Sequence, residues 1–295
     1  MIHYTSCPVC SSSAINLEIN CFDYFKTNDP FPIWKCSICG ISFTQDRPED
    51  DNLECYYESD NYISHGNSSG GIINRIYKIV RNFTLNKKKN VVKRESGQTA
   101  GSLLDIGSGT GHFAAKMKKE GWSVKGIEIN EKAKEFSISQ FGIEALSPSE
   151  ILHLPDSEFD CITLWHSLEH ISDLNKQITE IRRLLKPQGV CIVAVPNTNS
   201  YDAKHYKKHW AAYDVPRHLW HFNPDALSSL FESKGFKLRN IRLLPLDVFY
   251  ISILSERYKK NPLAFFAGIL KGVFFAIKTL FNKKGGSSLI YVFAK

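Results

Sequence analysis

The sequence has 295 residues, of which 43% are hydrophobic and 12% aromatic, and it carries a net charge of +7. This composition is that of an ordinary globular protein and excludes an intrinsically disordered chain. A chain of this length can bury one substantial core together with a smaller appended unit.

The charge is distributed unevenly along the chain. Residues 1–60 have 3 Lys and Arg against 10 Asp and Glu, whereas residues 61–100 have 8 against 1. Residues 101–200 have 10 against 13, and residues 201–295 have 16 against 6. A basic surface attracts RNA, anionic lipid or a phosphorylated ligand, and charge alone does not choose among them.

The first predicted unit, residues 1–60, carries two Cys-x-x-Cys pairs. Cys7 and Cys10 form the first pair, and Cys36 and Cys39 follow after 25 intervening residues. The opening residues MIHYTSCPVC lack the basic start and apolar run of a signal peptide, so we expect a reducing, cytoplasmic setting. The pairs therefore predict a tetrahedral, structural zinc site rather than disulfides, with unliganded surface cysteines as the alternative.

A Gly- and Ser-rich segment, SHGNSSGG at residues 64–71, predicts a hinge. Apolar residues then recur at helical spacing on a basic segment that ends in NKKKNVVKR. We assign residues 61–98 to this hinge and basic helix, and residues 99–295 to a second, larger domain.

From about residue 100 onward, short apolar runs alternate with helical patterns. Runs such as SLLDIG, SVKGIEI, FDCITLW and GVCIVAVP are separated by amphipathic segments such as GHFAAKMKKEG and LNKQITEIRRLLKP. This alternation predicts parallel strands joined by crossover helices, which is a doubly wound, Rossmann-like α/β fold.

A glycine-rich loop follows the first of these runs. Gly107, Gly109 and Gly111 stand directly before a predicted helix, and Glu128 ends the next predicted strand. Glycine lets the backbone turn sharply and lets a ligand approach the N–H groups at the helix N-terminus, while a carboxylate can accept both hydroxyls of a ribose. The combination predicts a nucleoside site, with a tight turn that binds nothing as the alternative.

Asp105 narrows the choice of nucleoside. A carboxylate just ahead of the glycines would repel the pyrophosphate of a dinucleotide, but it attracts the ammonium group and the sulfonium of S-adenosylmethionine (SAM). The stretch LLDIGSGTG resembles motif I of the class I SAM-dependent methyltransferases. The resemblance covers residues 100–245 and returns in the last strand, SSLIYVFAK.

The resemblance implies which residues bind the cofactor. Asp105, Gly107 and Gly109 line its methionine end, with Gly111 as a further contact, and Glu128 holds its ribose. GIEIN resembles the ribose-binding strand end and LPDSEFDCITLWHSLEH the fourth motif of the family. The remaining implied contacts are Ile129, Trp165 and, for adenine in SPSEILHLP, one of Ser149, Glu150 and Ile151.

The stretch WHSLEHISD places His166, Glu169 and His170 at the carboxyl end of the fourth strand, beside the expected methyl group. It resembles the E-x-x-E-H of ubiquinone-pathway O-methyltransferases, whose acidic residues and histidine are implicated in Mg²⁺ binding. His166 replaces the first glutamate, which disfavours Mg²⁺ because this ion prefers oxygen ligands. The alternative is that Glu169 and His170 cap the following helix.

A second histidine-bearing segment, YDVPRHLWHFNPDAL, resembles a loop of many small-molecule methyltransferases. A histidine is suited to take a proton from the acceptor during methyl transfer. We predict His218 as this base, with His221 and His166 as further candidates. One alternative is that these histidines only fix the loop to the sheet. Another is that methyl transfer needs no base, because alignment of acceptor and cofactor suffices.

Zinc-bearing N-terminal units occur in some rRNA guanine methyltransferases and in sugar C-methyltransferases. The acidic residues 1–60 offer only Lys26, Lys35 and Arg47 to a phosphate backbone, which disfavours RNA, although the basic helix keeps RNA as an alternative. We predict a SAM-dependent methyltransferase that releases S-adenosylhomocysteine and methylates oxygen or carbon of a small-molecule, sugar or lipid-like acceptor. The rivals are an RNA base methyltransferase, a non-catalytic SAM-binding module and, least favoured, a dehydrogenase.

About forty residues, 247–286, precede the last predicted strand, where class I methyltransferases normally have a short hairpin. They contain LAFFAGILKGVFFAIKTLF, residues 263–281, which approaches the length of a bilayer span. Its less apolar positions share one side of a helix: Gly268, Lys271, Gly272, Lys278 and Thr279. We expect an amphipathic helix on the inner face of an anionic membrane or over a lipidic substrate, with a lid on the domain's own core as the alternative.

Overall fold

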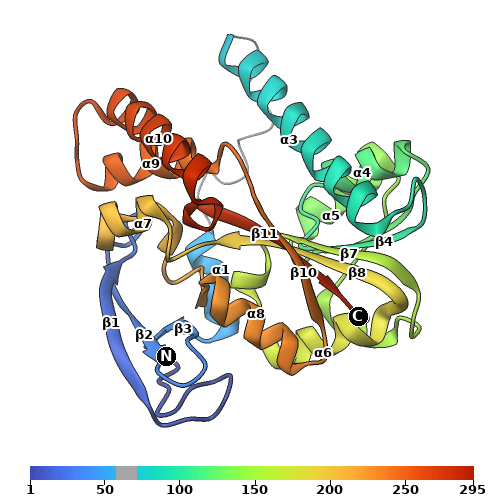
Figure 1. The fold of residues 1–295 in the computed structure, drawn as a ribbon, viewed down its shortest axis with the longest axis horizontal. Coiled ribbons are helices and arrows are strands. Elements are labelled where there is room, and N and C mark those ends of the chain that lie inside the picture. Colours follow the sequence, from blue (N-terminus) through green and yellow to red (C-terminus); the bar gives the residue numbers. More distant parts are fainter. Residues whose placement is uncertain (58–71) are drawn as a thin grey trace.

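The computed structural model of the chain describes residues 1–57 and 72–295, and the hinge predicted at 64–71 lies outside the described residues. The described residues form two sheets flanked by helices (Figure 1). The strands of the larger sheet are β4 (Ser102–Ile106), β5 (Ser123–Ile127), β6 (Ala145–Leu146), β7 (Phe159–Trp165), β8 (Leu185–Pro196), β10 (Lys237–Leu243) and β11 (Ser288–Ala294).

The larger sheet has the order β10-β11-β8-β7-β4-β5-β6. β11 runs antiparallel to both of its neighbours, and the pairs from β8 to β6 are all parallel. The order reverses direction at β4, which begins the sheet and has later strands on both sides. This arrangement confirms the predicted doubly wound α/β fold.

Two layers of helices cover the sheet because neighbouring strand residues point to opposite faces. Leu103 packs with Val92 of α3 (Ile72–Ser96) and Phe113 of α4 (His112–Lys119), and α5 (Glu131–Phe141) lies beside α4. Leu104 lies on the other face, in the core cluster that also includes Ile178 of α6 (Leu174–Leu184) and residues of α8 (Pro224–Ser233). The parallel strands are therefore buried on both faces, as their continuous apolar runs require.

The smaller sheet, here called the N-terminal sheet, has the order β1-β2-β3-β9. Its strands are β1 (Ile15–Phe22), β2 (Pro30–Cys36), β3 (Ser42–Thr44) and β9 (Trp220–His221), and α1 (Asp50–Tyr57) follows β3 in the chain. β9 comes from the predicted acceptor loop and pairs antiparallel with β3, while the backbone N–H of Thr44 donates to the Leu219 carbonyl at 2.9 Å. The N-terminal unit is therefore completed by a segment of the larger domain.

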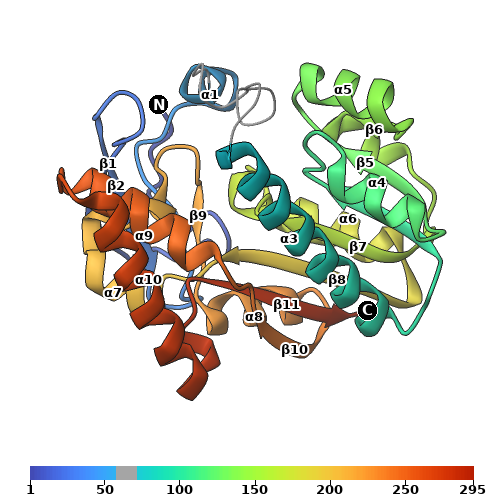
Figure 2. The same ribbon diagram turned by 90° about the horizontal axis from the view of Figure 1, so that it is seen from above.

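The insertion before the last strand is helical, as predicted, and it forms a hairpin of two helices. It consists of α9 (Asp247–Tyr258) and α10 (Ala264–Phe281), which lie against each other near the short helix α7 (Tyr201–Tyr206) (Figures 1 and 2). The two helices approach closely because a Cβ on Gly268 would collide with Ile253, and a Cβ on Gly272 with Phe249.

Candidate cofactor and acceptor site

The predicted cofactor loop follows β4 and leads directly into α4. Gly107, Gly109 and Gly111 have positive φ angles of 74°, 53° and 76°, which L side chains rarely adopt. A Cβ on Gly107 or Gly111 would collide with a serine side chain, so packing requires these two glycines. A Cβ on Gly109 would meet no atom within 4 Å, so the backbone there is open to a ligand.

Glu128 follows β5, and its carboxylate reaches the glycine loop. The backbone N–H of Gly109 donates to Oε2 at 2.7 Å, and that of Asn130 donates to Oε1 at 2.9 Å. Both oxygens keep a lone pair free, so the carboxylate is held in place and still able to accept hydroxyl groups. The structure thus brings together the two sequence features from which the nucleoside site was predicted.

Asp105 lies buried near the end of β4. The hydroxyl of Thr163 on β7 donates a 2.6 Å hydrogen bond to its Oδ1. Burial raises the pKa of Asp105 to about 6, against the opposing effects of Thr163 and Lys88. A cationic group close to this carboxylate would therefore stabilise its ionised form.

Lys88 is a site residue that we did not predict. Its Nζ lies 4.8 Å from the centre of the Trp165 ring, and it interacts electrostatically with Asp105 and Asp247. Burial lowers the pKa of this lysine. A signal was present in the sequence, because Lys88 lies three residues after Leu85 and four before Val92 and so shares their inward face of α3.

Two hydrophobic side chains at this edge have features that fit a ligand. The side chain of Ile129, next to Glu128, is 79% exposed. Trp165 is buried and packs edge to face on Phe113 with ring centres 5.5 Å apart. Its indole N–H is buried and donates to no group among the described residues, and such orphan donors are rare unless a ligand or water completes them.

The predicted adenine segment forms a short 3-10 helix, Pro148–His153. Oε2 of Glu150 accepts a 2.7 Å hydrogen bond from the backbone N–H of Ser147, so this carboxylate caps the helix. Ile151 is part of the hydrophobic core, and Ser149 is exposed. The adenine contact stays a prediction for these three residues.

His166 stands at the end of β7 with a positive φ of 57°. Its Nε2 lies 2.9 Å from Oδ2 of Asp247, and its Nδ1 lies 3.3 Å from Oε1 of Glu169. Burial opposes protonation, but the two carboxylates outweigh it and raise the pKa of His166 to about 10. At neutral pH this side chain is an imidazolium that joins β7 to the start of α9, so its environment does not suit a general base.

Glu169, His170 and His218 meet beside it, with donor atoms that all lie within 4.8 Å of one another. Nδ1 of His170 lies 3.0 Å from the Arg217 carbonyl oxygen, and Nδ1 of His218 lies 2.9 Å from that of Ala212. Carbonyl oxygens accept, so each Nδ1 carries a proton and each Nε2 presents a lone pair. Oε2 of Glu169 is buried and makes no hydrogen bond with the described residues.

The cluster of Glu169, His170 and His218 contains two of the residues at which Mg²⁺ was predicted. Burial and the neighbouring His218 lower the pKa of His170 to about 4, so its imidazole is neutral at physiological pH. Two imidazole nitrogens and one carboxylate suit a transition-metal ion better than Mg²⁺, which prefers oxygen ligands. Mg²⁺ at Glu169 and His170 stays a prediction, with a donor set that fits it poorly.

His221 is held by the fold rather than presented to a ligand. Its Nε2 lies 2.9 Å from Oγ1 of Thr44, and the Thr44 hydroxyl in turn donates to the His218 carbonyl at 2.7 Å. His221 therefore donates to Thr44, and burial lowers its pKa to about 3. This neutral imidazole pins the acceptor loop to the N-terminal sheet.

Arg217 makes a second link between the loop and the N-terminal sheet. Its guanidinium donates to Asp23 at 2.9 Å and to Asp214 at 2.7 Å. The side chains of Arg217 and Asp23 are 3% and 0% exposed, so this ion pair is sheltered from solvent. Asp23 lies directly after β1, so a distant segment fixes the loop that carries His218.

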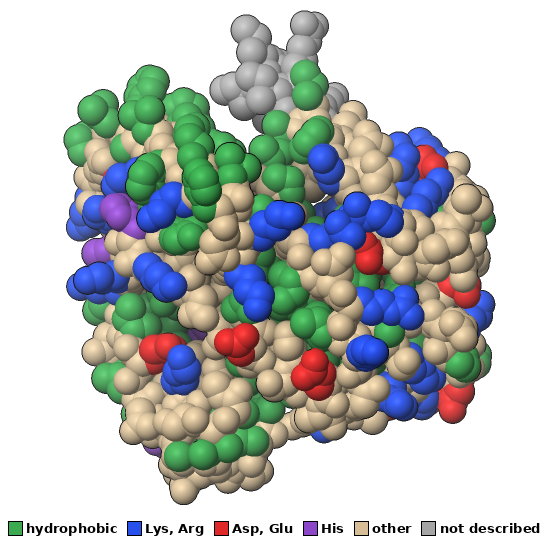
Figure 3. All heavy atoms as spheres, viewed as in Figure 1, with side chains coloured by type: hydrophobic (Ala, Val, Ile, Leu, Met, Phe, Trp, Pro, Cys, Tyr) green, Lys and Arg blue, Asp and Glu red, His purple; other side chains and the backbone are tan. Residues whose placement is uncertain are grey.

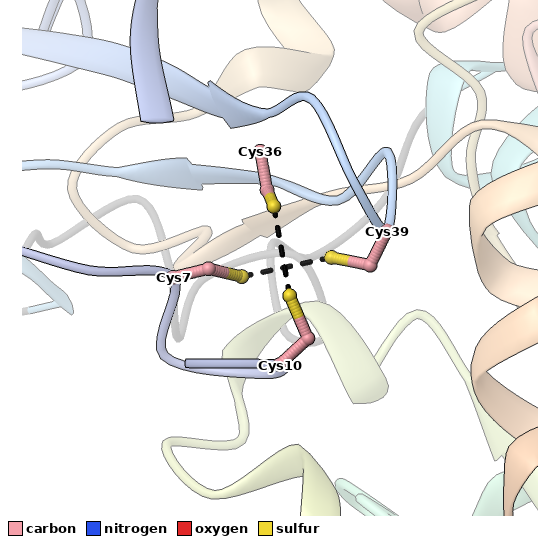
Figure 4. A group of neighbouring side chains, drawn as sticks. All are labelled: Cys7, Cys10, Cys36 and Cys39. Atoms are coloured by element: carbon pink, nitrogen blue, oxygen red, sulfur yellow. Dashed lines mark hydrogen bonds between the residues drawn. The ribbon is translucent and has the colours of Figure 1, made fainter. Parts of the chain in front are cut away.

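The four predicted zinc ligands converge, as Figure 4 shows. The Sγ atoms of Cys7 and Cys39 are 3.6 Å apart, as are those of Cys10 and Cys36. A tetrahedral ion with Zn–S bonds of about 2.3 Å places its sulfurs about 3.8 Å apart, so the spacing fits Zn²⁺. Cys161 and Cys191 are buried in the larger sheet, as expected.

The basic helix α3 uses several of its charges within the molecule. Lys89 and Lys93 pair with Glu120 at 3.2 and 2.6 Å, and Arg94 pairs with Glu95 at 3.2 Å. These ion pairs and the inward-facing Lys88 reduce the positive charge that the helix offers to an anionic polymer.

Comparison with known proteins agrees with this geometry. The family model for a methyltransferase domain matches residues 78–241, more than half of the chain. The chain is 33% identical over 102 residues to the ubiquinone/menaquinone biosynthesis C-methyltransferase UbiE of Pectobacterium carotovorum, covering 31% of this chain and 41% of that one. It is 30% identical over 105 residues to the ubiquinone biosynthesis O-methyltransferase of Thiobacillus denitrificans, covering 33% and 45%.

The chain thus spans less than half the length of each of these relatives. Among solved structures, a Galdieria sulphuraria protein provisionally assigned as a sarcosine dimethylglycine methyltransferase is similar, with a TM-score of 0.50 and 17% identity. The similarity covers 74% of this chain and 86% of that one, and it supports the fold.

Proposed function

The chain belongs to the class I SAM-dependent methyltransferase family, and from this premise we propose that it methylates a small-molecule, sugar or lipid-like acceptor. The contact that carries the proposal is the one between Glu128 and the backbone N–H of Gly109. It holds a carboxylate beside an open glycine turn at the carboxyl ends of two adjacent parallel strands, where ligands of this fold bind.

The residues present fit the cofactor. S-adenosylmethionine, when bound, supplies an electrophilic methyl group attached to a sulfonium. Glu128 would accept the ribose hydroxyls, Gly109 would allow close approach, and the carboxylate of Asp105 would favour the cationic end. Lys88 offers an ammonium group at the same edge, suited to the methionine carboxylate.

His218 is the base that the geometry supports best among the three candidates. Its Nδ1–H donates to the Ala212 carbonyl, which leaves Nε2 to accept a proton from the acceptor. Asp214, 4.0 Å from Nε2, can stabilise the resulting imidazolium. His166 already carries a proton between two carboxylates, and His221 uses its Nε2–H on Thr44.

The proposed acceptor class rests on two observations. Three of the positive charges of α3 are used within the molecule, because Lys89 and Lys93 pair with Glu120 and Lys88 faces inward, which speaks against the RNA alternative. The two relatives named above are methyltransferases of ubiquinone or menaquinone biosynthesis, and on this ground we propose a small, lipid-like acceptor for this chain.

We also propose that Cys7, Cys10, Cys36 and Cys39 hold a structural Zn²⁺. The thiol spacing supports this, and four thiolates leave no open position for a substrate. The ion would stabilise the N-terminal sheet, which carries β9 and therefore one side of the acceptor loop.

Substitution of Glu128 tests the function. We expect Glu128→Ala to weaken S-adenosylhomocysteine binding about 100-fold, because hydrogen bonds to a charged group contribute about 1.5–3 kcal/mol each. Turnover is measured as S-adenosylhomocysteine released with quinol-precursor phenols, sugar nucleotides or rRNA as acceptor. Glu135→Ala, on the exposed face of α5, is the matched control.

Release that requires an acceptor from the first two groups supports the proposal. Release only with rRNA would favour the RNA alternative, and binding without release for any acceptor would favour a non-catalytic module. Glu128→Ala with unchanged affinity would remove the contact on which the proposal depends.

A further inference from the structure

α10 presents an exposed apolar face that no other described element covers. Of the chain's most exposed large hydrophobic side chains, a large share lies on this one helix or directly before it. They are Leu263 (64%), Phe265 (57%), Phe266 (67%), Leu270 (71%), Val273 (43%), Phe274 (56%), Ile277 (51%), Leu280 (75%) and Phe281 (88%). Soluble monomers rarely expose contiguous apolar surface of this kind unless it binds something.

The opposite face of α10 packs against the rest of the protein. Its buried positions are mostly small, and two of them, Gly268 and Gly272, allow close contact with α9. Lys271 on the same side pairs at 2.6 Å with Glu256, whose side chain is 1% exposed. The side of α10 that carries Gly268, Lys271 and Gly272 therefore faces α9. Lys278 is exposed and lies over the Tyr201 ring at 4.6 Å, and the rest of the exposed side is largely apolar.

This packing distinguishes a helix that lies on a bilayer from one that crosses it. α10 has the length and hydropathy of a span, and it is the one such helix among the described residues, with 28% of its residues buried. To cross a membrane alone it would have to leave α9 and break the Lys271–Glu256 pair, which would strand a charge on each helix. A position parallel to the surface keeps these contacts and buries the apolar face.

The charges around the hairpin are basic. Residues 247–286 contain seven Lys and Arg against two acidic residues. Both acids are neutralised internally, Asp247 by His166 and Glu256 by Lys271. Lys259, Lys260, Lys283 and Lys284 flank the two ends of α10, form no ion pair with the described residues, and would reach anionic headgroups.

A second apolar patch lies on α3. Ile79, Val80 and Phe83 are 68%, 43% and 46% exposed, and Lys87 lies over the Phe83 ring at 5.3 Å. Figures 1 and 3 show the N-terminal half of α3 and the α9–α10 hairpin on the same side of the molecule, and Figure 2 looks down on both. The exposed apolar surfaces of α3 and α10, each with lysines nearby, therefore lie on the same side of the molecule.

We propose that this side, with α10 as its main contact, binds the surface of an anionic phospholipid bilayer. α9 begins at Asp247, which contacts His166 at the acceptor edge, and α3 carries Lys88 at the cofactor edge. The α9–α10 hairpin and α3 thus both border the predicted site. Membrane binding next to this site would favour an acceptor that is carried in the bilayer. This statement about the acceptor rests on the proposed function.

Vesicle flotation of the full-length, zinc-replete chain tests the proposal. The wild type is expected to float with phosphatidylcholine vesicles that contain about 30% phosphatidylglycerol and much less with pure phosphatidylcholine. Combined Phe266→Ser, Leu270→Ser and Phe274→Ser should lower the partition coefficient at least about tenfold, because each removes an apolar side chain from the contact. Replacing the four flanking lysines by glutamine should remove the preference for anionic vesicles.

The matched control replaces two exposed hydrophobic residues elsewhere by serine: Leu17 (51%) and Ile138 (54%). It should float like the wild type. All variants should bind S-adenosylhomocysteine normally, so failure of vesicle binding is distinguishable from failure of the proposed function.

Equal flotation of the wild type and the α10 variant would overturn the proposal. A second contradicting result is a wild type that does not bind vesicles but forms a dimer in light scattering, if the α10 variant is monomeric. The apolar face would then bind a second copy of the chain.

Discussion

The two edges of the site are built in different ways. The cofactor edge comes largely from one continuous stretch, in which Gly109 and Glu128 are nineteen residues apart and joined through backbone N–H groups. The acceptor edge is assembled from the end of β7, the loop around His218 and the N-terminal sheet, with the Asp23–Arg217 contact spanning 194 residues. The geometry of the cofactor edge therefore depends mainly on one turn, whereas the geometry of the acceptor edge depends on the folding of every unit that contributes to it.

The comparison predicts that damage to the N-terminal unit spares the cofactor and removes the acceptor. The three substitutions below are ordered by the size of the effect that we expect.

The largest effect should follow Cys36→Ser. A structural zinc site contributes on the order of 10 kcal/mol of binding free energy to the fold around it, so we expect loss of zinc and melting of the N-terminal sheet. Acceptor-dependent turnover should fall about 100-fold or more, and S-adenosylhomocysteine affinity should stay within about threefold. Metal analysis, calorimetry and turnover measure the three quantities, with the exposed, non-cluster Cys55→Ser as control.

Two results would break the comparison. One is a Cys36→Ser variant that keeps its zinc and its turnover. The other is a variant that loses cofactor binding together with turnover, which would mean that the two edges fold as one unit.

A smaller effect is expected from Asp23→Asn. The Asp23–Arg217 pair is buried, and removal of one partner from such a pair destabilises a protein by about 3 kcal/mol. Glu18→Gln, in the exposed Glu18–Lys35 pair, should change the free energy of unfolding by less than about 1 kcal/mol. Denaturant unfolding gives both values, and equal losses would show that burial of the Asp23–Arg217 pair is unimportant.

The smallest effect concerns pH, because the side chains of His166 and Asp247 are 33% and 24% exposed and solvent screens their interaction. The partners Asp247 and Glu169 raise the pKa of His166 in the folded protein to about 10, above the ordinary value of about 6.5. The stabilisation is therefore complete below about pH 6.5 and is lost as the pH rises towards 10. The difference in unfolding free energy between wild type and His166→Gln should narrow from pH 6 to pH 9.5. A constant difference would contradict the assignment, and a substitution at exposed His153 serves as control.

The sequence predicted those parts of the fold and the site that are formed by residues close together in the chain. The doubly wound sheet, the glycine turn, Glu128 and the four converging cysteines were predicted because periodicity and spacing report the type of each element, the position of turns and sets of metal ligands directly. The helical character of the insertion at 247–286 was predicted for the same reason, but its hairpin of two helices was not.

What the sequence did not indicate depends on contacts between distant segments. Nothing in the spacing of His221 shows that β9 completes the N-terminal sheet, because a two-residue strand has no periodicity of its own. The partner of His166, Asp247, lies 81 residues away. The inward Lys88 was hidden in a run of three lysines that looks solvent-exposed as a group, although its helical phase with Leu85 and Val92 marks it as different.

Calorimetric titration of S-adenosylhomocysteine into the zinc-replete chain tests the central claim most directly. The account predicts saturable binding of one molecule per chain, with no binding of NAD under the same conditions. Absence of saturable heat with both S-adenosylhomocysteine and S-adenosylmethionine would contradict it.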